Sequence, residues 1–251
     1  LWLACADPAQ CLATLNAFRG RLGEAVMAGE IMPRIAVEQA LSLIDGLRAP
    51  MPVTPPWSLL LEVGVFDERG QISETIDAIL HDCMAAGLVQ DGVIAQTNEQ
   101  ARALWQIREG VPEAETRAGP SIKHDVSVPV AMIPALIEEG TALLERLYPG
   151  SRPVPFGHLG DGNLHFNLCA PAEAVGDPER EAHFLAAWGE INAAFHDLVG
   201  SMGGSISAEH GIGQLKKDEL ARTADPVGLA LMRQLKATLD PENRFNPGKL
   251  I

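Results

Sequence analysis

The spacing of hydrophobic residues changes repeatedly along this chain between the periods of helices and of strands. Segments with an apolar residue at every third or fourth position predict helices over residues 8–22, 35–47, 73–86, 99–108, 134–147, 178–199 and 226–239. Short apolar or alternating runs predict strands over residues 57–66, 91–95, 124–129, 152–157, 163–168 and 205–207. The tail over residues 243–249 is expected to be irregular.

Residues that favour helix ends flank several of these segments. An Asp-Pro pair opens the helices near residues 8, 178 and 226, Ser73 is expected to be an N-cap, and Pro134 suits a first helical position. The helix over 178–199 has a stripe of apolar positions that predicts a buried face: Phe184, Trp188, Ile191, Phe195 and Leu198.

The order of elements predicts the fold class. Strands often come in pairs flanked by helices, which favours an α+β fold with a mostly antiparallel sheet over a doubly wound α/β fold. No strand is followed by a dinucleotide fingerprint or a P-loop. We predict one domain over residues 1–251, with no internal repeat visible in the residues.

Composition narrows the classes of partner. The chain is 47% hydrophobic and 21% charged, with a net charge of −14 and no basic stripe. This argues against nucleic acid and anionic membrane surfaces as partners. No apolar run reaches the roughly 20 residues of a transmembrane helix. Four cysteines lie far apart without a CxxC motif, which favours free thiols in a reducing compartment, and we expect a cytoplasmic protein.

The segment from Phe156 to Asn167 carries the strongest chemical signal. It contains two histidines, His158 and His165, on either side of an Asp-Gly turn signal. If Asp161 and Gly162 are the two central residues of a tight hairpin, residue 158 pairs directly with 165. The histidine Cβ atoms would then lie roughly 5 Å apart, close enough to hold one metal ion.

Glu209 and His210 could complete such a site. Two histidines and one carboxylate leave open positions on zinc or iron. Adjacent side chains point in different directions, so one can face the metal while the other faces a substrate. The competing interpretation is a polar turn before the helix that contains Lys216 and Lys217.

Further polar residues could bind a substrate. Alternation along residues 163–168 puts Asn163, His165 and Asn167 on one face of the strand. Arg108 and Lys123 are either solvated surface charges or a cationic clamp for a carboxylate, which an arginine can bind with two hydrogen bonds.

Three motifs give the chain a family resemblance. Gly157-His-Leu-Gly-Asp-Gly-Asn-Leu-His165, Ser207-Ala-Glu-His-Gly-Ile-Gly213 and Asn246-Pro-Gly-Lys249 are similar to signatures of the FAD-linked oxidase C-terminal domain. Trp105–Glu109 and Ser121–Pro129 match two further stretches. The resemblance spans essentially the whole chain, and the family includes D-lactate, glycolate and D-2-hydroxyglutarate dehydrogenases.

This resemblance implies a ferredoxin-like α+β substrate or cap domain that follows an N-terminal FAD-binding domain. It also implies a role for each matched residue. His158, His165 and Glu209 would bind a divalent ion, often zinc, and His210 would be the general base. Arg108 and Lys123 would bind substrate carboxylates, Asn167 would contact the substrate, and Asn246 would lie near the flavin.

The implied reaction is oxidation of a D-2-hydroxy acid to the 2-oxo acid with hydride transfer to FAD. Nothing in this chain resembles the flavin pyrophosphate loop, so we expect the FAD-binding domain to lie outside it and the chain alone to be inactive. Pro112 stands where hydroxyglutarate-type members often carry a hydroxyl residue, which weakens that substrate.

Two alternatives from other classes remain open, along with the oligomeric state, which could be a homodimer. One is a free-standing metal-dependent hydrolase, although no helical HExxH motif is present. The other is a non-catalytic binding module that retains the motifs as a remnant.

Overall fold

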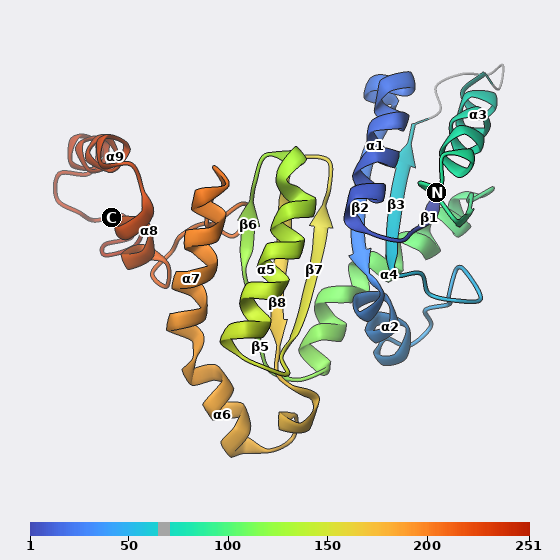
Figure 1. Cartoon of the computed structure of the whole chain (residues 1–251). Helices are drawn as coiled ribbons and strands as arrows, with labels where there is room; N and C mark the ends of the chain where they lie inside the picture. Colours follow the sequence, from blue (N-terminus) through green and yellow to red (C-terminus); the bar gives the residue numbers. More distant parts are fainter. Residues whose placement is uncertain (65–70) are drawn as a thin grey trace.

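A computed structural model describes residues 1–64 and 71–251, which form one sheet with helices on both faces (Figure 1). The strand order is β4-β1-β3-β2-β7-β8-β5, and β6 also pairs with β8. Every strand pair in the described ranges is antiparallel. The predicted α+β fold with a mostly antiparallel sheet is therefore confirmed.

The element bounds follow from this structure. The strands are β1 (Trp2–Cys5), β2 (Val26–Pro33), β3 (Trp57–Val63), β4 (Asp91–Val93), β5 (Ser121–Ile122), β6 (Asp125–Ser127), β7 (Arg152–His158) and β8 (Asn163–Cys169). The helices are α1 (Pro8–Leu22), α2 (Arg34–Leu43), α3 (Gln71–Ala85), α4 (Asn98–Arg117), α5 (Ile133–Leu147), α6 (Pro178–Ala186), α7 (Trp188–Ser201), α8 (Lys217–Thr223) and α9 (Pro226–Leu239).

The fold contains an internal repeat that the residues do not reveal. In the first half, β1, α1, β2, β3, α3 and β4 form a ferredoxin-like βαββαβ unit, with α2 inserted between β2 and β3. The second half repeats this order with β6, α5, β7, β8 and α7. In place of a sixth element, Ser205 forms a single bridge to Ser127 of β6. The halves join where β2 pairs with β7 (Figure 1).

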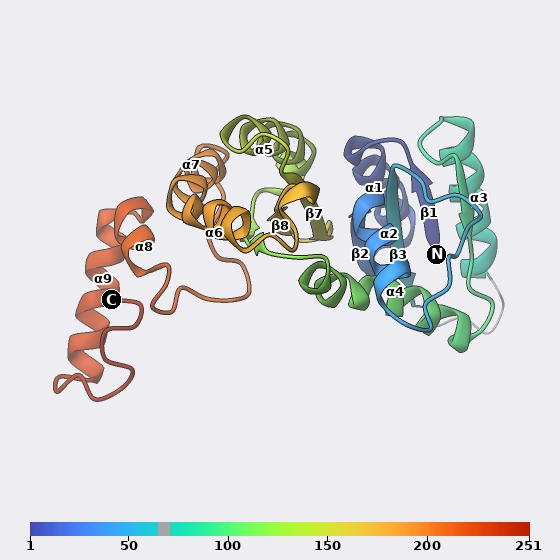
Figure 2. The same ribbon diagram turned by 90° about the horizontal axis from the view of Figure 1, so that it is seen from below.

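Two hydrophobic cores cover the two faces of the sheet. Helices α1, α3, α5 and α7 pack on one face, where Phe18, Phe166 and Phe195 are fully buried. On the other face, α2 and α4 pack over the first half and β7, around Ile107 and Phe156 (Figure 2). That second face of β8 carries polar side chains, and the candidate site lies there.

Several predicted elements need correction. Strands β1 and β2 were not predicted, because β1 is a four-residue apolar run and β2 contains Gly29 and Pro33. Helix α4 continues through Pro112 to residue 117, since Val111 and Ala114 are buried against α2. Only a single bridge forms in the strand predicted over 205–207.

Other boundaries also differ from the prediction. The helix predicted over 178–199 is two helices that meet at Ala187, and α2 ends four residues early. Ser73 lies inside α3 and is not its N-cap, because the helix begins at residue 71. The end of the strand predicted over 57–66 lies outside the described residues. No helix in the described ranges is long and apolar enough to cross a membrane.

Candidate functional site

The hairpin that carries His158 and His165 is wider than predicted. A four-residue turn, 159–162, joins β7 to β8, so His158 pairs with Asn163 and His165 pairs with Phe156. The predicted register was wrong because it required a two-residue type I′ turn with positive φ at both Asp161 and Gly162, and only Gly162 in this turn has one, at 89°. The buried Leu159 instead donates its N–H to the Gly29 carbonyl of β2, 2.8 Å away.

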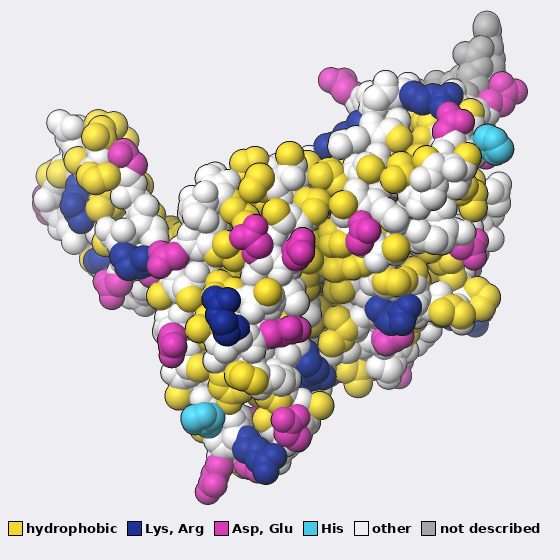
Figure 3. Space-filling view, viewed as in Figure 1, with side chains coloured by type: hydrophobic (Ala, Val, Ile, Leu, Met, Phe, Trp, Pro, Cys, Tyr) yellow, Lys and Arg dark blue, Asp and Glu magenta, His cyan; other side chains and the backbone are white. Residues whose placement is uncertain are grey.

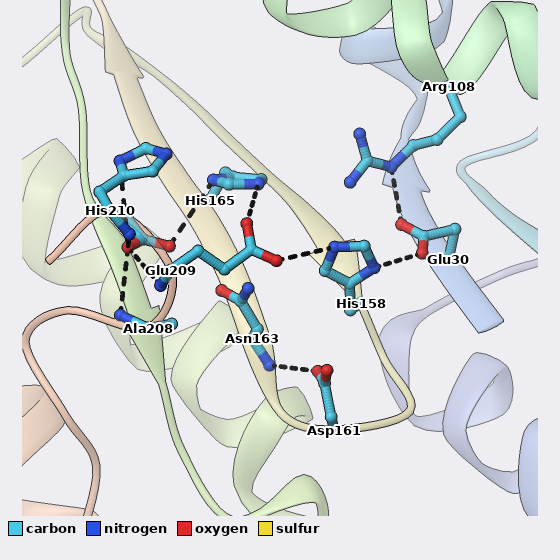
Figure 4. A network of polar contacts seen from close by, with 10 residues as sticks. Glu30, Arg108, His158, Asp161, Asn163, His165, Ala208, Glu209 and His210 are labelled. Carbon is cyan, nitrogen blue, oxygen red and sulfur yellow. Dashed lines mark hydrogen bonds and ion pairs between the residues drawn. The ribbon is translucent and has the colours of Figure 1, made fainter. Parts of the chain in front are cut away.

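The two histidines are therefore diagonal neighbours on one face of the hairpin, and a carboxylate lies between them. The Glu209 Oε1 atom is 3.2 Å from His158 Nε2, and its Oε2 atom is 3.9 Å from His165 Nε2 (Figure 4). The structure thus brings together the three residues that the resemblance implies as ion ligands.

Glu30 holds the other ring nitrogen of His158. Its Oε1 atom is 2.5 Å from His158 Nδ1, and its Oε2 atom accepts a hydrogen bond from Arg108 Nε at 2.7 Å. The Arg108 guanidinium also lies 4.9 Å from the centre of the Phe156 ring, in a cation–π contact. This places Arg108 beside the histidines, as part of one polar network (Figure 4).

Asp125 organises the segment that carries Glu209 and His210. It is buried in β6, and its Oδ2 atom accepts the backbone N–H groups of Ala208, Glu209 and His210 at 3.1, 2.9 and 2.8 Å. Burial alone would raise the pKa of Asp125, but these N–H groups and the nearby histidines outweigh it and keep the pKa below its ordinary value.

Asp125 also faces the ring of His165, with Oδ1 4.0 Å from Nδ1. Burial, followed by the charge of Arg108, lowers the pKa of His165. The neutral imidazole that results is the form that binds a metal ion.

Two sets of donors could hold a divalent ion, and both use His165. The first is His158, His165 and Glu209, as described above. The second is Asp125, His165 and His210, whose ligand atoms lie within 4.8 Å of one another. Imidazole nitrogens with one carboxylate suit zinc or iron, so the donor chemistry fits the implied ion in either position.

Asn167 and Lys123 lie further along the same face. The Asn167 amide donates to Glu115 Oε2 at 2.7 Å and accepts the His124 N–H at 3.3 Å, so both its ends are held. Lys123 Nζ is 3.4 Å from the Thr116 hydroxyl. Glu115 is buried among these groups, and burial raises its pKa to about 7.

His210 opens onto a cleft of about 460 Å³ that Lys123, Trp188 and Asn192 also line. Its ring stacks on that of His165 with centroids 5.6 Å apart. Asn246, in contrast, lies in the tail after α9, and within the described ranges no hydrogen bond links its side chain to another candidate residue.

Sequence reasoning missed three buried carboxylates around this site, Glu30, Asp125 and Glu115. Each acid stands next to a buried apolar residue of the same element, and that pattern is the signal that could have found them; the neighbours are Ile31, Ala114 and Val126. Glu30 was out of reach because its strand, β2, was not predicted.

The family model for the C-terminal domain of FAD-linked oxidases matches residues 1–250. The chain belongs to this family. The match covers nearly all of its length and agrees with the motifs around His158, His165 and Glu209. It argues against a free-standing hydrolase.

Curated relatives carry related names. The D-2-hydroxyglutarate dehydrogenase of Xanthomonas citri pv. viticola is 40% identical over 234 residues, which are 93% of this chain and 47% of that protein. The mitochondrial D-2-hydroxyglutarate dehydrogenase of Arabidopsis thaliana is 35% identical over 250 residues, which are 100% of this chain and 42% of that protein. This chain therefore spans about half the length of these relatives.

Solved structures share the fold at low identity. p-Cresol methylhydroxylase with substrate bound gives a TM-score of 0.62 at 15% identity, over 99% of this chain and 52% of that one. The 4-ethylphenol oxidase of Gulosibacter chungangensis, in complex with isoeugenol, gives 0.63 at 14% identity, over 99% of this chain and 53% of that one.

Proposed function

We propose that this chain is the substrate- and ion-binding part of an FAD-dependent dehydrogenase that oxidises a D-2-hydroxy acid to the 2-oxo acid. The observation that carries the proposal is the Glu209 carboxylate, which presents one oxygen to Nε2 of His158 and the other to Nε2 of His165. Family membership and the names of the relatives support the same reaction class.

His158, His165 and Glu209 would hold the divalent ion, with zinc as the expected metal. We favour this set over the one with Asp125 because it matches the three positions that the family resemblance implies, although the Oδ1 atom of Asp125 is also buried without a hydrogen bond. It also leaves the His210 ring free. A carboxylate partner on the second nitrogen of His158 is typical of zinc-bound histidines.

The remaining polar residues would bind and deprotonate the substrate. Only Nε of Arg108 bonds to Glu30 in the described part of the chain, which leaves two terminal nitrogens for a substrate carboxylate. Lys123 and Asn167 would make further contacts. His210, half-exposed in the cleft, would take the proton of the α-hydroxyl as general base.

When bound, the ion would supply Lewis-acid polarisation of the hydroxyl and FAD would accept the hydride. We assign FAD binding chiefly to an N-terminal domain of the same protein, with Asn246 near the flavin. An apolar stripe on α9 supports such a partner domain, because Val227, Leu231, Leu235 and Leu239 are 54–79% exposed (Figure 3).

D-2-hydroxyglutarate is the substrate that the relatives' names favour. Pro112 removes the hydroxyl that such enzymes often carry at this position, but the hydroxyl of Thr116, one helical turn later, lies beside Lys123.

A cytoplasmic location remains part of the proposal and is supported by four buried, unpaired cysteines. A homodimer remains a prediction.

The test separates the roles of two adjacent residues in the full-length protein. His210→Ala should keep the metal and lose turnover by about a hundredfold or more, the usual scale for loss of a general base. Glu209→Ala should lose metal and turnover together. Metal content by elemental analysis and steady-state rates with D-2-hydroxyglutarate, D-lactate and glycolate measure both.

The opposite pattern identifies the other ion position. If His210→Ala strips the metal while His158→Ala and Glu209→Ala keep it, the ion is bound by Asp125, His165 and His210, and His210 is not the base. Absence of any activity on the three acids in the flavin-loaded wild type would contradict the proposed reaction.

A further inference from the structure

Glu30 is a buried carboxylate at the junction between the two halves of the sheet. Strands β2 and β7 pair at only two positions, and Glu30 faces His158 at one of them. The Glu30 side chain is 1% exposed, and both of its oxygens are engaged, with His158 and with Arg108. Such partners offset the cost of burying the charge of a carboxylate.

These contacts link two parts of the proposed site that come from different elements. On one side, Nδ1 of His158 donates its proton to Glu30, which leaves the lone pair of Nε2 on the side of Glu209 (Figure 4). On the other side, Nε of Arg108 in α4 donates to the second oxygen of the same carboxylate.

We propose that Glu30 is a positioning residue that orients His158 for ion binding and Arg108 for carboxylate binding, so that one acid aligns the two halves of the site. This inference rests on the proposed function. Glu30 comes from β2, the strand of the first half that pairs with β7, and β7 carries His158.

Glu30→Gln is the decisive variant, because its amide replaces one of the two acceptor oxygens with an NH2 donor, so either His158 or Arg108 then faces a donor. In the full-length protein, stripped of metal with a chelator, zinc titration should give a dissociation constant about 10–100-fold weaker than wild type. With saturating zinc, kcat should largely recover while KM for D-2-hydroxyglutarate stays raised.

Glu62→Gln is the matched control. Glu62 lies in the neighbouring strand β3 and accepts a hydrogen bond from Trp105 in α4 at 2.8 Å, but contacts neither His158 nor Arg108 through any bond in the described ranges. It should bind zinc as wild type does. Glu30→Asp, which keeps the charge but is shorter, provides a second variant if Glu30→Gln does not fold, and it should also bind zinc more weakly.

Two results would overturn the inference and are distinguishable. Wild type that binds no zinc would overturn the proposed function together with the role of Glu30. Wild-type zinc binding that is unchanged in Glu30→Gln and in Glu30→Asp, or weakened equally in Glu62→Gln, would overturn only the role of Glu30.

Discussion

Buried acids dominate the candidate site at the scale of single residues, and each is stabilised in a different way. Glu30 has two cationic or imidazole partners, whereas Asp125 relies mainly on three backbone N–H groups. Among the residues that the structure describes, Glu115 has only the Asn167 amide as a direct hydrogen-bond partner, and its Oε1 atom is buried without one. Glu115 is therefore the acid whose charged form is least well compensated.

The stability of the chain should depend on the protonation of Glu115. Burial raises its pKa to about 7, whereas in the unfolded chain it should be about 4.3. The raised pKa stabilises the fold fully below about pH 4, and this contribution is lost as the pH rises through about 7. Relative to wild type, Glu115→Gln should therefore gain up to roughly 3 kcal/mol between pH 4 and pH 8.5.

Urea unfolding of both proteins at several pH values measures this gain. Glu113→Gln is a suitable control, because Glu113 is an exposed acid on the same helix, paired with Arg117. A difference between wild type and Glu115→Gln that stays constant with pH would show that Glu115 does not titrate in this range.

The sequence was sufficient to predict which residues of the two motif strands belong to the site, but not which residues hold them in place. Histidines 158 and 165 share a face because strand residues two apart always do and because their strands pair, even though the predicted register was wrong. Their partners Glu30 and Asp125 are 128 and 40 positions away in sequence, and tertiary pairing alone brings them together.

At the scale of elements, the turn between β7 and β8 is constrained by its contact with Val128, the residue that directly follows β6. The Gly162 carbonyl accepts the Val128 N–H at 3.0 Å, and a Cβ atom on Gly162 would lie 2.0 Å from the Val128 carbonyl oxygen. Gly162 also has a φ of 89°. Two separate constraints therefore require glycine at this position.

Gly162→Ala should lower the free energy of unfolding by at least about 3 kcal/mol, because it combines positive φ with a backbone clash. Gly46→Ala isolates the first effect, since Gly46 has a similar φ of 85° but a Cβ atom added there would meet nothing within 4 Å. We expect a loss of about 1 kcal/mol there. Equal losses in the two variants, measured by urea unfolding, would mean that the turn moves away from β6 at little cost.

Elements with helical spacing were the most predictable, and elements with mixed signals were the least. Helix α9 was predicted with its correct ends, because Asp225 caps it and its apolar positions are periodic. Strand β2 was missed because Gly29 and Pro33 resemble turn residues, although Gly29 packs tightly against Leu15 of α1. The break at residue 187 was missed because the apolar run around it fits one continuous helix, and Gly189, two residues later, is only a weak signal.

At the scale of the whole molecule, α8 and α9 form an arm beyond α7, away from the first half of the sheet (Figures 1 and 2). Helix α9 has one buried residue, Leu229, while the apolar stripe on α9 and Phe245, 72% exposed, face outward. Such a surface is unfavourable in water and indicates an interaction site. Under the proposed function, this surface is where an N-terminal FAD-binding domain would pack, and the relatives are about twice as long as this chain.

Replacing Leu231 and Leu235 with serine should therefore affect stability differently in the isolated chain and in the full-length protein. In the isolated chain both side chains are exposed, so the midpoint of unfolding should change little while binding of a hydrophobic dye decreases. In the full-length protein the same change should lower stability by about 2 kcal/mol or more for each leucine, because burial would be lost.

Leu185→Ser on α6, 45% exposed, is the control and should be neutral in both settings. A full-length protein that tolerates the double change would contradict the assignment, and a halved mass in solution would assign the stripe to a second copy of the chain.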